Sequence, residues 1–165
     1  MLKTVAAYIT GFFDGDGSVR LQLQPRANAS LGFRIRAILS FAQKTGHAGE
    51  LSWIRNQLGI GYIYARNDGM TELKIEGFER VYKILKQLAP YTRFKKKQVA
   101  LVLEGLAILR QDPGAILKIA RIADQISSFN YATTRKKYTS DFIKQQLEQK
   151  LTPVTTDPAL SAGEK

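Results

Sequence analysis

The segment Ile9-Thr10-Gly11-Phe12-Phe13-Asp14-Gly15-Asp16-Gly17 joins an apolar helix, predicted over residues 4–13, to two closely spaced carboxylates. Strict alternation follows at once in Ser18-Val19-Arg20-Leu21-Gln22-Leu23-Gln24, which is typical of a strand with one buried face. Asp-Gly-Asp-Gly is ordinary turn chemistry, so the string alone predicts a turn before it predicts a ligand. An EF-hand calcium loop is excluded, because Val19 and Pro25 stand where that loop needs Gly and Glu.

The rest of the chain supplies the elements of an α+β fold. Strands are predicted over 18–24 and 31–42, and a second pair over 61–66 and 70–76 flanks the turn signal Asn67-Asp68-Gly69. Further helices are predicted over 46–58, 77–88, 94–110, 113–129 and 140–151. The order is α-β-β-α-β-β-α followed by more helix. We expect residues 1–151 to form a single domain, and residues 152–165, which lack periodicity, to be a disordered tail.

The charge balance favours nucleic acid as the partner. Lys and Arg number 25 against 14 Asp and Glu, and the formal net charge is +11. The basic residues are spread over predicted strands, loops and helices, whereas a membrane-surface protein would gather them on one amphipathic helix, so no membrane partner is expected. With no Cys and with His47 as the single His, any metal must be held by oxygen, which suits Mg²⁺, Mn²⁺ or Ca²⁺.

The two carboxylates lie at a predicted helix C-terminus, where backbone carbonyls already carry partial negative charge. Asp14 and Asp16 are unfavourable there unless a cation binds or a capping hydrogen bond forms. The small residues Ala6, Ala7 and Gly11 let this helix approach another helix closely. Two such helices side by side would bring two Asp16 carboxylates and backbone carbonyls together as an oxygen cage for a hard divalent ion.

This segment is similar to the signature of the LAGLIDADG homing endonucleases, and the element order over residues 4–110 resembles that family. The resemblance implies a curved antiparallel sheet that forms a DNA-binding saddle. It also implies that Asp16 and the Gly15 carbonyl bind metal, and that Asp14 has a structural, helix-capping role. Thr10 departs from the usual small Ala and is expected at the seam between two helices. Because the chain holds one motif, the resemblance implies a homodimer through the helix containing Gly11, with a shared active site.

Three polar residues complete the active site that the resemblance implies. Gln43 matches a Gln that positions the attacking water, and Lys95 matches a Lys that reaches the scissile region. His47 falls where the family has another basic residue, although a His is largely neutral at about pH 8. Each also has a plainer interpretation, because Lys runs and His residues at helix starts commonly face solvent.

The polar side of the predicted strands is rich in Arg and Gln and is expected to contact DNA bases. Arg pairs with guanine and Gln with adenine in the major groove, whereas Lys residues near helix starts contact phosphates without specifying sequence. The plainer interpretation is a soluble sheet surface. The candidate DNA-binding residues are Arg20, Gln22, Gln24, Arg26, Arg34, Arg36, Ser40, Tyr64, Arg66, Glu72, Lys74, Lys96, Lys97 and Lys136.

The resemblance therefore implies a site-specific double-strand DNA endonuclease, encoded in a mobile intron, that hydrolyses a long pseudo-palindromic site and leaves 3′ overhangs. Mg²⁺ is the expected cofactor, Mn²⁺ is expected to substitute, and Ca²⁺ to bind without supporting cleavage. Two rivals keep the fold: an RNA maturase that binds its own intron RNA, and a DNA-binding regulator that does not cut. No targeting peptide is visible, so we expect the protein to work where it is encoded, in a chloroplast or mitochondrion or in an archaeal or bacterial cytoplasm.

Overall fold

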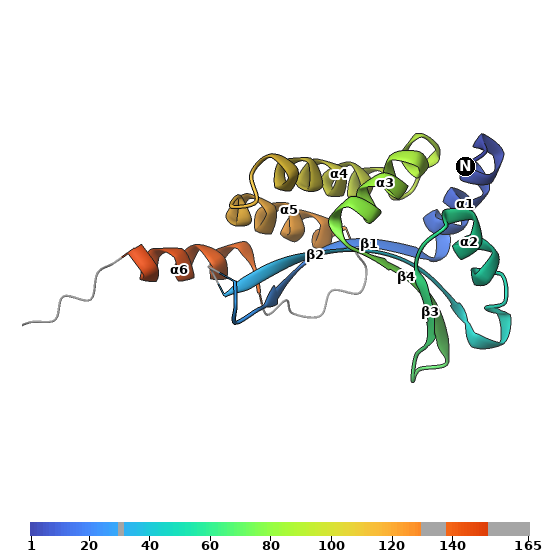
Figure 1. Ribbon diagram of the computed structural model, residues 1–165, viewed down its shortest axis with the longest axis horizontal. Helices are drawn as coiled ribbons and strands as arrows, with labels where there is room; N and C mark the ends of the chain where they lie inside the picture. The colour runs from blue at the N-terminus through green and yellow to red at the C-terminus, as the bar shows by residue number, and fades with distance from the viewer. Residues whose placement is uncertain (30–31, 130–137, 152–165) are drawn as a thin grey trace, which may run out of the picture.

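The computed structural model describes residues 1–29, 32–129 and 138–151 (Figure 1). Lys136 and the tail 152–165 therefore lie outside the described residues. The helices and strands are α1 (Lys3–Asp16), β1 (Gly17–Pro25), β2 (Phe33–Lys44), α2 (Leu51–Leu58), β3 (Tyr62–Ala65), β4 (Met70–Glu76), α3 (Phe78–Leu88), α4 (Lys96–Gln111), α5 (Ile116–Ser128) and α6 (Ser140–Leu151), with short 3-10 turns η1 (Thr45–His47) and η2 (Ala89–Tyr91).

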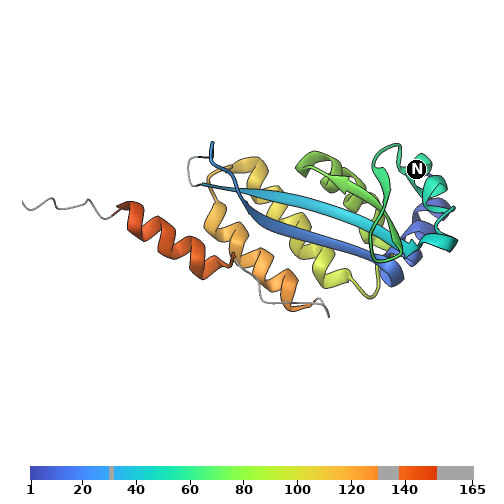
Figure 2. The ribbon, with the colours of Figure 1, turned by 90° about the horizontal axis from the view of Figure 1, so that it is seen from below.

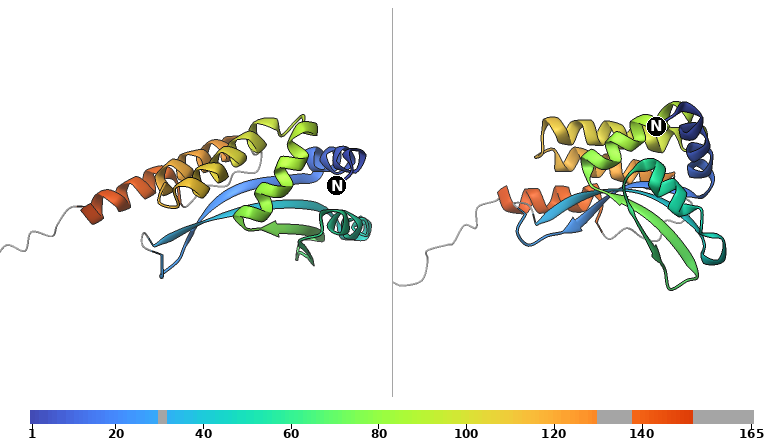
Figure 3. Two further views of the ribbon diagram at one scale, coloured as in Figure 1. Left: turned by 45° about the horizontal axis from the view of Figure 1, so that its top comes forward. Right: turned by 45° about the vertical axis from the view of Figure 1, so that its right-hand side comes forward.

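The four strands form one antiparallel sheet in the order β1-β2-β4-β3. The helices α3, α4 and α5 lie on one face of this curved sheet, and the view from below shows the strands in front of them (Figures 1 and 2). In every view α1 and α2 lie beside each other at one end of the molecule, with α6 at the other end (Figure 3). The predicted α+β class, with a curved antiparallel sheet and additional C-terminal helices, is confirmed.

The hydrophobic core lies between the sheet and these helices. The alternating residues Val19, Leu21 and Leu39 point into it and are almost completely buried. Leu106 of α4 and Ile119 of α5 meet them from the other side, each with an exposed fraction of 0%. Because each such side chain contributes about 1.5–3 kcal/mol when it leaves water, the alternation determines which face of the sheet packs on the helices.

The helix-to-strand junction is sharper than the sequence predicts. Helix α1 runs through Asp14, Gly15 and Asp16, and β1 begins at the next residue, Gly17. A Cβ on Gly17 would lie 2.6 Å from the Phe13 carbonyl oxygen, so only glycine fits there. Both carboxylates thus lie on the last turn of α1, not in a separate loop.

Two predicted helices are shorter in the structure. The helix expected over 46–58 is divided into η1 and α2, because Gly46 and Gly49 weaken the helix between them. The helix expected from 113 begins at Ile116, since the Asp112 carboxylate accepts the Gly114 amide at 2.8 Å and forms a local turn instead. Among the described residues, no helix combines the length and apolar character needed to cross a bilayer.

Candidate active site and DNA-facing surface

Three segments far apart in sequence meet at the C-terminal end of α1. Gln43 of β2 donates from Nε2 to Oδ2 of Asp16 at 3.4 Å. Lys95, just before α4, donates from Nζ to the carbonyl of Gly15 at 3.3 Å and to the carbonyl of Asp14. The structure therefore brings together four residues that separate parts of the sequence predicted for the site: Asp16, Gly15, Gln43 and Lys95.

The Asp14 carboxylate joins the segment before α4 to the C-terminal end of α1. Its side chain is 9% exposed and accepts the backbone amides of Arg93 at 2.7 Å and Lys95 at 3.1 Å. Because Lys95 is the residue that precedes α4, the carboxylate lies at the N-terminal end of α4, where negative charge is favourable. The contacts of Asp14 are thus those of a structural residue that fixes the Lys95 loop to α1.

The donor atoms at this point fit a hard divalent cation. The Asp16 carboxylate and the Gly15 carbonyl supply oxygen atoms of the kind that such cations bind. The Lys95 ammonium, which is itself a cation, already contacts the carbonyls of Asp14 and Gly15 at this helix end. Burial holds the pKa of Lys95 below its usual range, more strongly than the carboxylates of Asp14 and Asp16 raise it. Within the described residues, no three His, Asp or Glu side chains gather in one place. Asp16 and the Gly15 carbonyl by themselves therefore offer fewer oxygens than a hard divalent cation takes.

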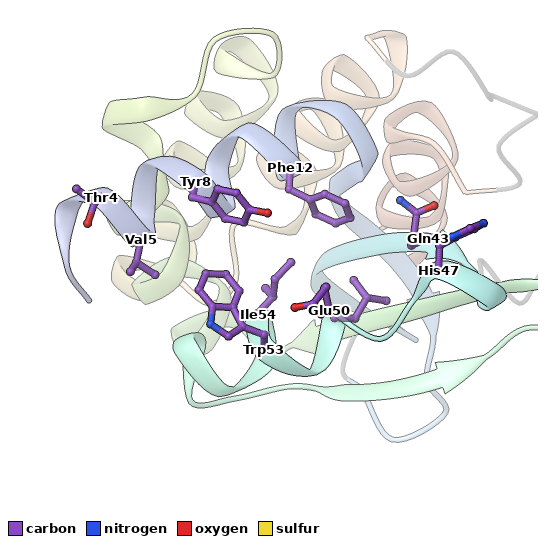
Figure 4. Close-up of a pocket in the computed structure, with 10 residues that line it drawn as sticks. Thr4, Val5, Tyr8, Phe12, Gln43, His47, Glu50, Trp53 and Ile54 are labelled. Carbon is purple, nitrogen blue, oxygen red and sulfur yellow. The ribbon is translucent and has the colours of Figure 1, made fainter.

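His47 lies near this site but in a different environment. It is exposed in η1 and lines a cavity of about 550 Å³ between α1 and α2, beside Gln43 (Figure 4). Tyr8 and Trp53 also line the cavity, with ring centroids 5.5 Å apart and edge-to-face geometry. We call this cavity the α1–α2 groove.

The open face of the sheet carries the predicted Arg and Gln residues as one surface. The register pairs Gln22 with Arg36 and Gln24 with Arg34, so these side chains lie opposite each other. Arg34 donates to the Gln24 side-chain oxygen at 2.7 Å and 3.0 Å, and Arg36 forms an ion pair with Glu76. The surface is therefore organised by contacts among its own side chains before any ligand binds.

Glu72 and Ser40 lie deeper than the other predicted DNA contacts. Glu72 is 5% exposed, accepts a hydrogen bond from the Tyr64 hydroxyl and lies 3.8 Å from the Arg20 guanidinium. Ser40 is 3% exposed and hydrogen-bonds Ser18 at 2.9 Å. Burial opposes ionisation of Glu72, but hydrogen bonds from Tyr64 and Ser40 with nearby Arg20 and Lys74 outweigh it, so the pKa of Glu72 is lowered. The hydrogen bond between Tyr64 and Glu72 raises the pKa of Tyr64 to about 12. Glu72 thus supports the more exposed Arg20 and Tyr64.

Comparison with known proteins agrees with this geometry. The family model described as LAGLIDADG endonuclease matches residues 9–103. The chain is 32% identical to DNA endonuclease I-CreI of Chlamydomonas reinhardtii over 151 residues, covering 88% of this chain and 90% of the relative. It is 33% identical to DNA endonuclease I-CvuI of Chlorella vulgaris, covering 73% and 76% of the two chains. The chain belongs to the LAGLIDADG endonuclease family.

Solved structures of this family match over most of the chain. I-CvuI in complex with the I-CreI target in 2 mM Mg, with the DNA not cleaved, has a TM-score of 0.82 and 28% identity, and covers 89% of this chain and 94% of that one. The same values hold for I-CvuI bound to its own target in 2 mM Ca.

The remaining predicted residues lie around this LAGLIDADG core. Arg26 is exposed just beyond β1, and Arg66 is exposed and paired with Asp68 at the β3–β4 turn. Lys96 and Lys97 are exposed on the first turn of α4, and the Lys97 ammonium lies 5.6 Å from the centre of the Phe129 ring. All four residues therefore present a cationic side chain to solvent.

Two expectations about α1 were wrong. Thr10 does not lie at an exposed seam: it is completely buried, and its hydroxyl donates to the Ala6 carbonyl at 2.7 Å and to the Leu88 carbonyl of α3 at 3.4 Å. Ala6 also faces the core, with 4% of its surface exposed. The packing of α1 on α3 therefore accounts for Thr10, and the exposed small residues are Ala7 and Gly11.

Two further polar residues support the sheet surface, and the motifs in the sequence did not predict them. Glu76 pairs with Arg36 and with Lys74 at 3.0 Å, and it continues the alternation that had identified Lys74. Ser18 hydrogen-bonds Ser40 and belongs to the polar face of β1. The alternation contained both signals, although it carried no information about which residues pair.

Proposed function

We propose that this chain is a divalent-metal-dependent, site-specific DNA endonuclease that cuts both strands of a long, pseudo-palindromic duplex site and leaves 3′ overhangs. The observation that carries the proposal is the meeting of Asp16, Gln43 and Lys95 at one end of an open sheet face rich in Arg and Gln. The family membership and the DNA complexes of I-CvuI support it.

Each residue at the end of α1 has a role that its contacts support. Asp16 and the Gly15 carbonyl would hold the divalent ion, and Mg²⁺ bound there would supply positive charge that offsets the charge of the phosphate in the transition state. Gln43, hydrogen-bonded to Asp16, orients the attacking water from one side. Lys95 brings its ammonium to the scissile phosphate from the other side, held by the Asp14 clamp. His47, beside Gln43, contributes at the edge of the site.

The working unit is a homodimer formed through α1. Thr4, Ala7, Tyr8 and Gly11 form an exposed stripe along this helix, and Tyr8 is 69% exposed. A Cβ added at Gly11 meets nothing within 4 Å in the subunit, although a helical Gly costs about 1 kcal/mol relative to Ala. A second helix packed on the stripe explains that Gly, and it brings a second Asp16 to the same place.

Sequence recognition belongs to the open sheet face. Arg20, Gln22 and Arg36 project from paired strands toward the major groove, while Glu72 and Ser40 act indirectly by holding their neighbours. Lys96 and Lys97, with Lys136 from outside the described residues, contact phosphates and set the register on the duplex. Residues 1–151 act as one domain in this role.

Mg²⁺ is the cofactor for cleavage, with Mn²⁺ able to replace it, whereas Ca²⁺ supports binding alone. The protein acts in the compartment that encodes it, an organelle or an archaeal or bacterial cytoplasm. Intron RNA as a second partner belongs to the maturase alternative, which the following experiment separates.

The experiment is a selection from a randomised duplex library. Bound DNA is captured in Ca²⁺, Mg²⁺ is added to the same complexes, and the released ends are sequenced. A two-fold site cut on both strands is the expected result. Specific binding without cutting would instead indicate a regulator, and the absence of specific duplex binding would direct the work to structured intron RNA. Because I-CvuI left the I-CreI target uncleaved in 2 mM Mg, the Mg²⁺ concentration should be raised stepwise.

A further inference from the structure

Phe94 is an exposed aromatic residue with a fixed position. Its side chain is 86% exposed, the highest value among the large apolar residues described. Its two neighbours, Arg93 and Lys95, both donate their backbone amides to the Asp14 carboxylate. The ring is therefore presented to solvent by a clamped loop, which is typical of a residue that becomes buried on association.

The α1–α2 groove is a cavity of suitable character for such a ring. Its volume is about 550 Å³, and Tyr8, Phe12, Trp53 and Ile54 form its walls. Figure 4 shows Thr4 and Val5 at one end of the groove and Gln43 with His47 at the other. The ring of Trp53 is half-buried and faces Tyr8, so an apolar side chain entering the groove would cover both.

Phe94 and the groove lie on opposite flanks of α1. Thr4, Tyr8 and Phe12 recur every four residues and share the flank that faces α2. Thr10 and Asp14 lie on the other flank, where they contact Leu88 and the loop that carries Phe94. The exposed residues Ala7 and Gly11 run between these two flanks.

A two-fold axis along this exposed stripe places unlike flanks opposite each other. If two copies of α1 pack in parallel, the Phe94 flank of one faces the groove flank of the other, and both contacts occur twice. The two features also lie at the same level along the axis of α1. The loop of Phe94 is bound to Asp14, and the groove reaches Phe12 and Gln43 near the same end of the helix. An antiparallel pair would set like flanks together and would separate the two Asp16 residues.

We infer that Phe94 of each subunit inserts into the α1–α2 groove of the other. The inference rests on the proposed homodimer and specifies its contact. The charges beside the ring and the groove are complementary, because Arg93 is exposed next to Phe94 and Glu50 is exposed on the groove wall. Neither side chain has an ion-pair partner among the residues that the structure describes, so Arg93 of one copy can pair with Glu50 of the other.

This contact makes each active site depend on the other subunit. The inserted ring closes the groove beside Gln43 and His47 of its partner. The same loop carries Lys95, so insertion also immobilises the Lys95 loop of the subunit that supplies the ring. Dimer formation and ordering of both sites are thereby coupled.

Phe94→Ala tests the contact directly in the full-length chain without DNA. Trp53 is the only tryptophan, so its fluorescence reports on the groove. In the wild-type protein, emission is expected to shift to shorter wavelength as dimers form. Phe94→Ala should abolish this shift and raise the dimer Kd from sedimentation by at least about 100-fold, because each dimer loses two buried rings. The control Phe129→Ala removes a ring that is 40% exposed directly after α5 and should leave the Kd within about threefold of wild type.

A charge exchange tests the same contact without removing the ring. Arg93→Glu and Glu50→Arg should each weaken self-association, because both interfaces of the dimer then hold like charges. An equimolar mixture should recover dimers, since one interface regains the original pair and the other gains a reversed pair. A wild-type protein that stays monomeric would overturn the homodimer and this contact together. A wild-type dimer that Phe94→Ala leaves intact, or a mixture without recovery, would overturn the contact alone.

Discussion

Gly11→Ala should stabilise the isolated subunit and weaken the dimer. The substitution adds a Cβ that meets nothing within 4 Å inside the subunit, on the exposed stripe of α1. Replacing a helical Gly by Ala contributes about 0.8–1.0 kcal/mol to the free energy of unfolding. For a chain of this size, that raises the midpoint of thermal unfolding by about 2–4 °C.

The same methyl group has the opposite effect where two α1 helices meet. Each dimer gains two methyl groups at the point of closest approach, so we expect the dimer Kd to rise at least about tenfold, equivalent to about 1.4 kcal/mol. Thermal unfolding over a series of protein concentrations separates the two effects, because only the dimer has a concentration-dependent midpoint. Sedimentation gives the Kd, and cleavage of the selected site gives the activity, which should fall with dimer occupancy.

Gly105→Ala is the matched control. Gly105 is also helical, but a Cβ there would lie 2.8 Å from Cδ1 of Leu21 in the core. Overpacking against Leu21 costs about 1–3 kcal/mol, and the gain in helix propensity of about 0.8–1.0 kcal/mol offsets part of that cost. This variant should therefore lack the stabilisation expected for Gly11→Ala and leave the dimer Kd unchanged. A Gly11→Ala protein that is more stable, dimerises as tightly as wild type and cleaves at the same rate would refute the assignment of α1 to the interface.

Three further predictions concern the site and the sheet face. Asp16→Asn should abolish cleavage while largely preserving binding in Ca²⁺, as measured by plasmid cleavage and gel mobility; cutting at the wild-type rate would refute the metal-ligand assignment. Arg20→Ala and Gln22→Ala should each relax preference at one base pair by about 1–3 kcal/mol in a repeated library selection, whereas uniformly weaker binding would identify them as backbone contacts. Glu72→Gln should lower the free energy of unfolding by about 1–3 kcal/mol at pH 7. Because the pKa of Glu72 is lowered in the folded state, its stabilisation is present above its ordinary value of 4.5 and is lost as pH falls through the folded pKa. Urea unfolding should therefore show that the free energies of unfolding of the variant and the wild type converge in acid. An equal difference between them at pH 7 and in acid would contradict the assignment of Glu72 as ionised in the folded protein.

The polar face of the sheet shows which features the alternation of residues in a strand predicts and which it does not. Alternation in β1 and β2 correctly separated core residues such as Leu21 and Leu39 from polar residues such as Gln22 and Arg36. Burial of every second side chain is a local property of a strand, so it can be derived from neighbours in sequence. The exposure of a residue on the polar face is not local. Ser40 alternates with its neighbours like Arg36, yet it is 3% exposed, because it lies between Ser18 of β1 and Lys74 of β4.

The residues of the chain determined the fold class, the single acidic motif, the oxygen-based donor set and the cationic, Arg- and Gln-rich strands, because composition and period depend only on neighbouring residues. The packing of the helices on the sheet determined that Thr10 hydrogen-bonds α3 and that Asp14 binds the segment that carries Lys95. These contacts join residues 78 and 81 positions apart. No local pattern encodes such a contact, because its partner is determined by how whole helices pack on the sheet.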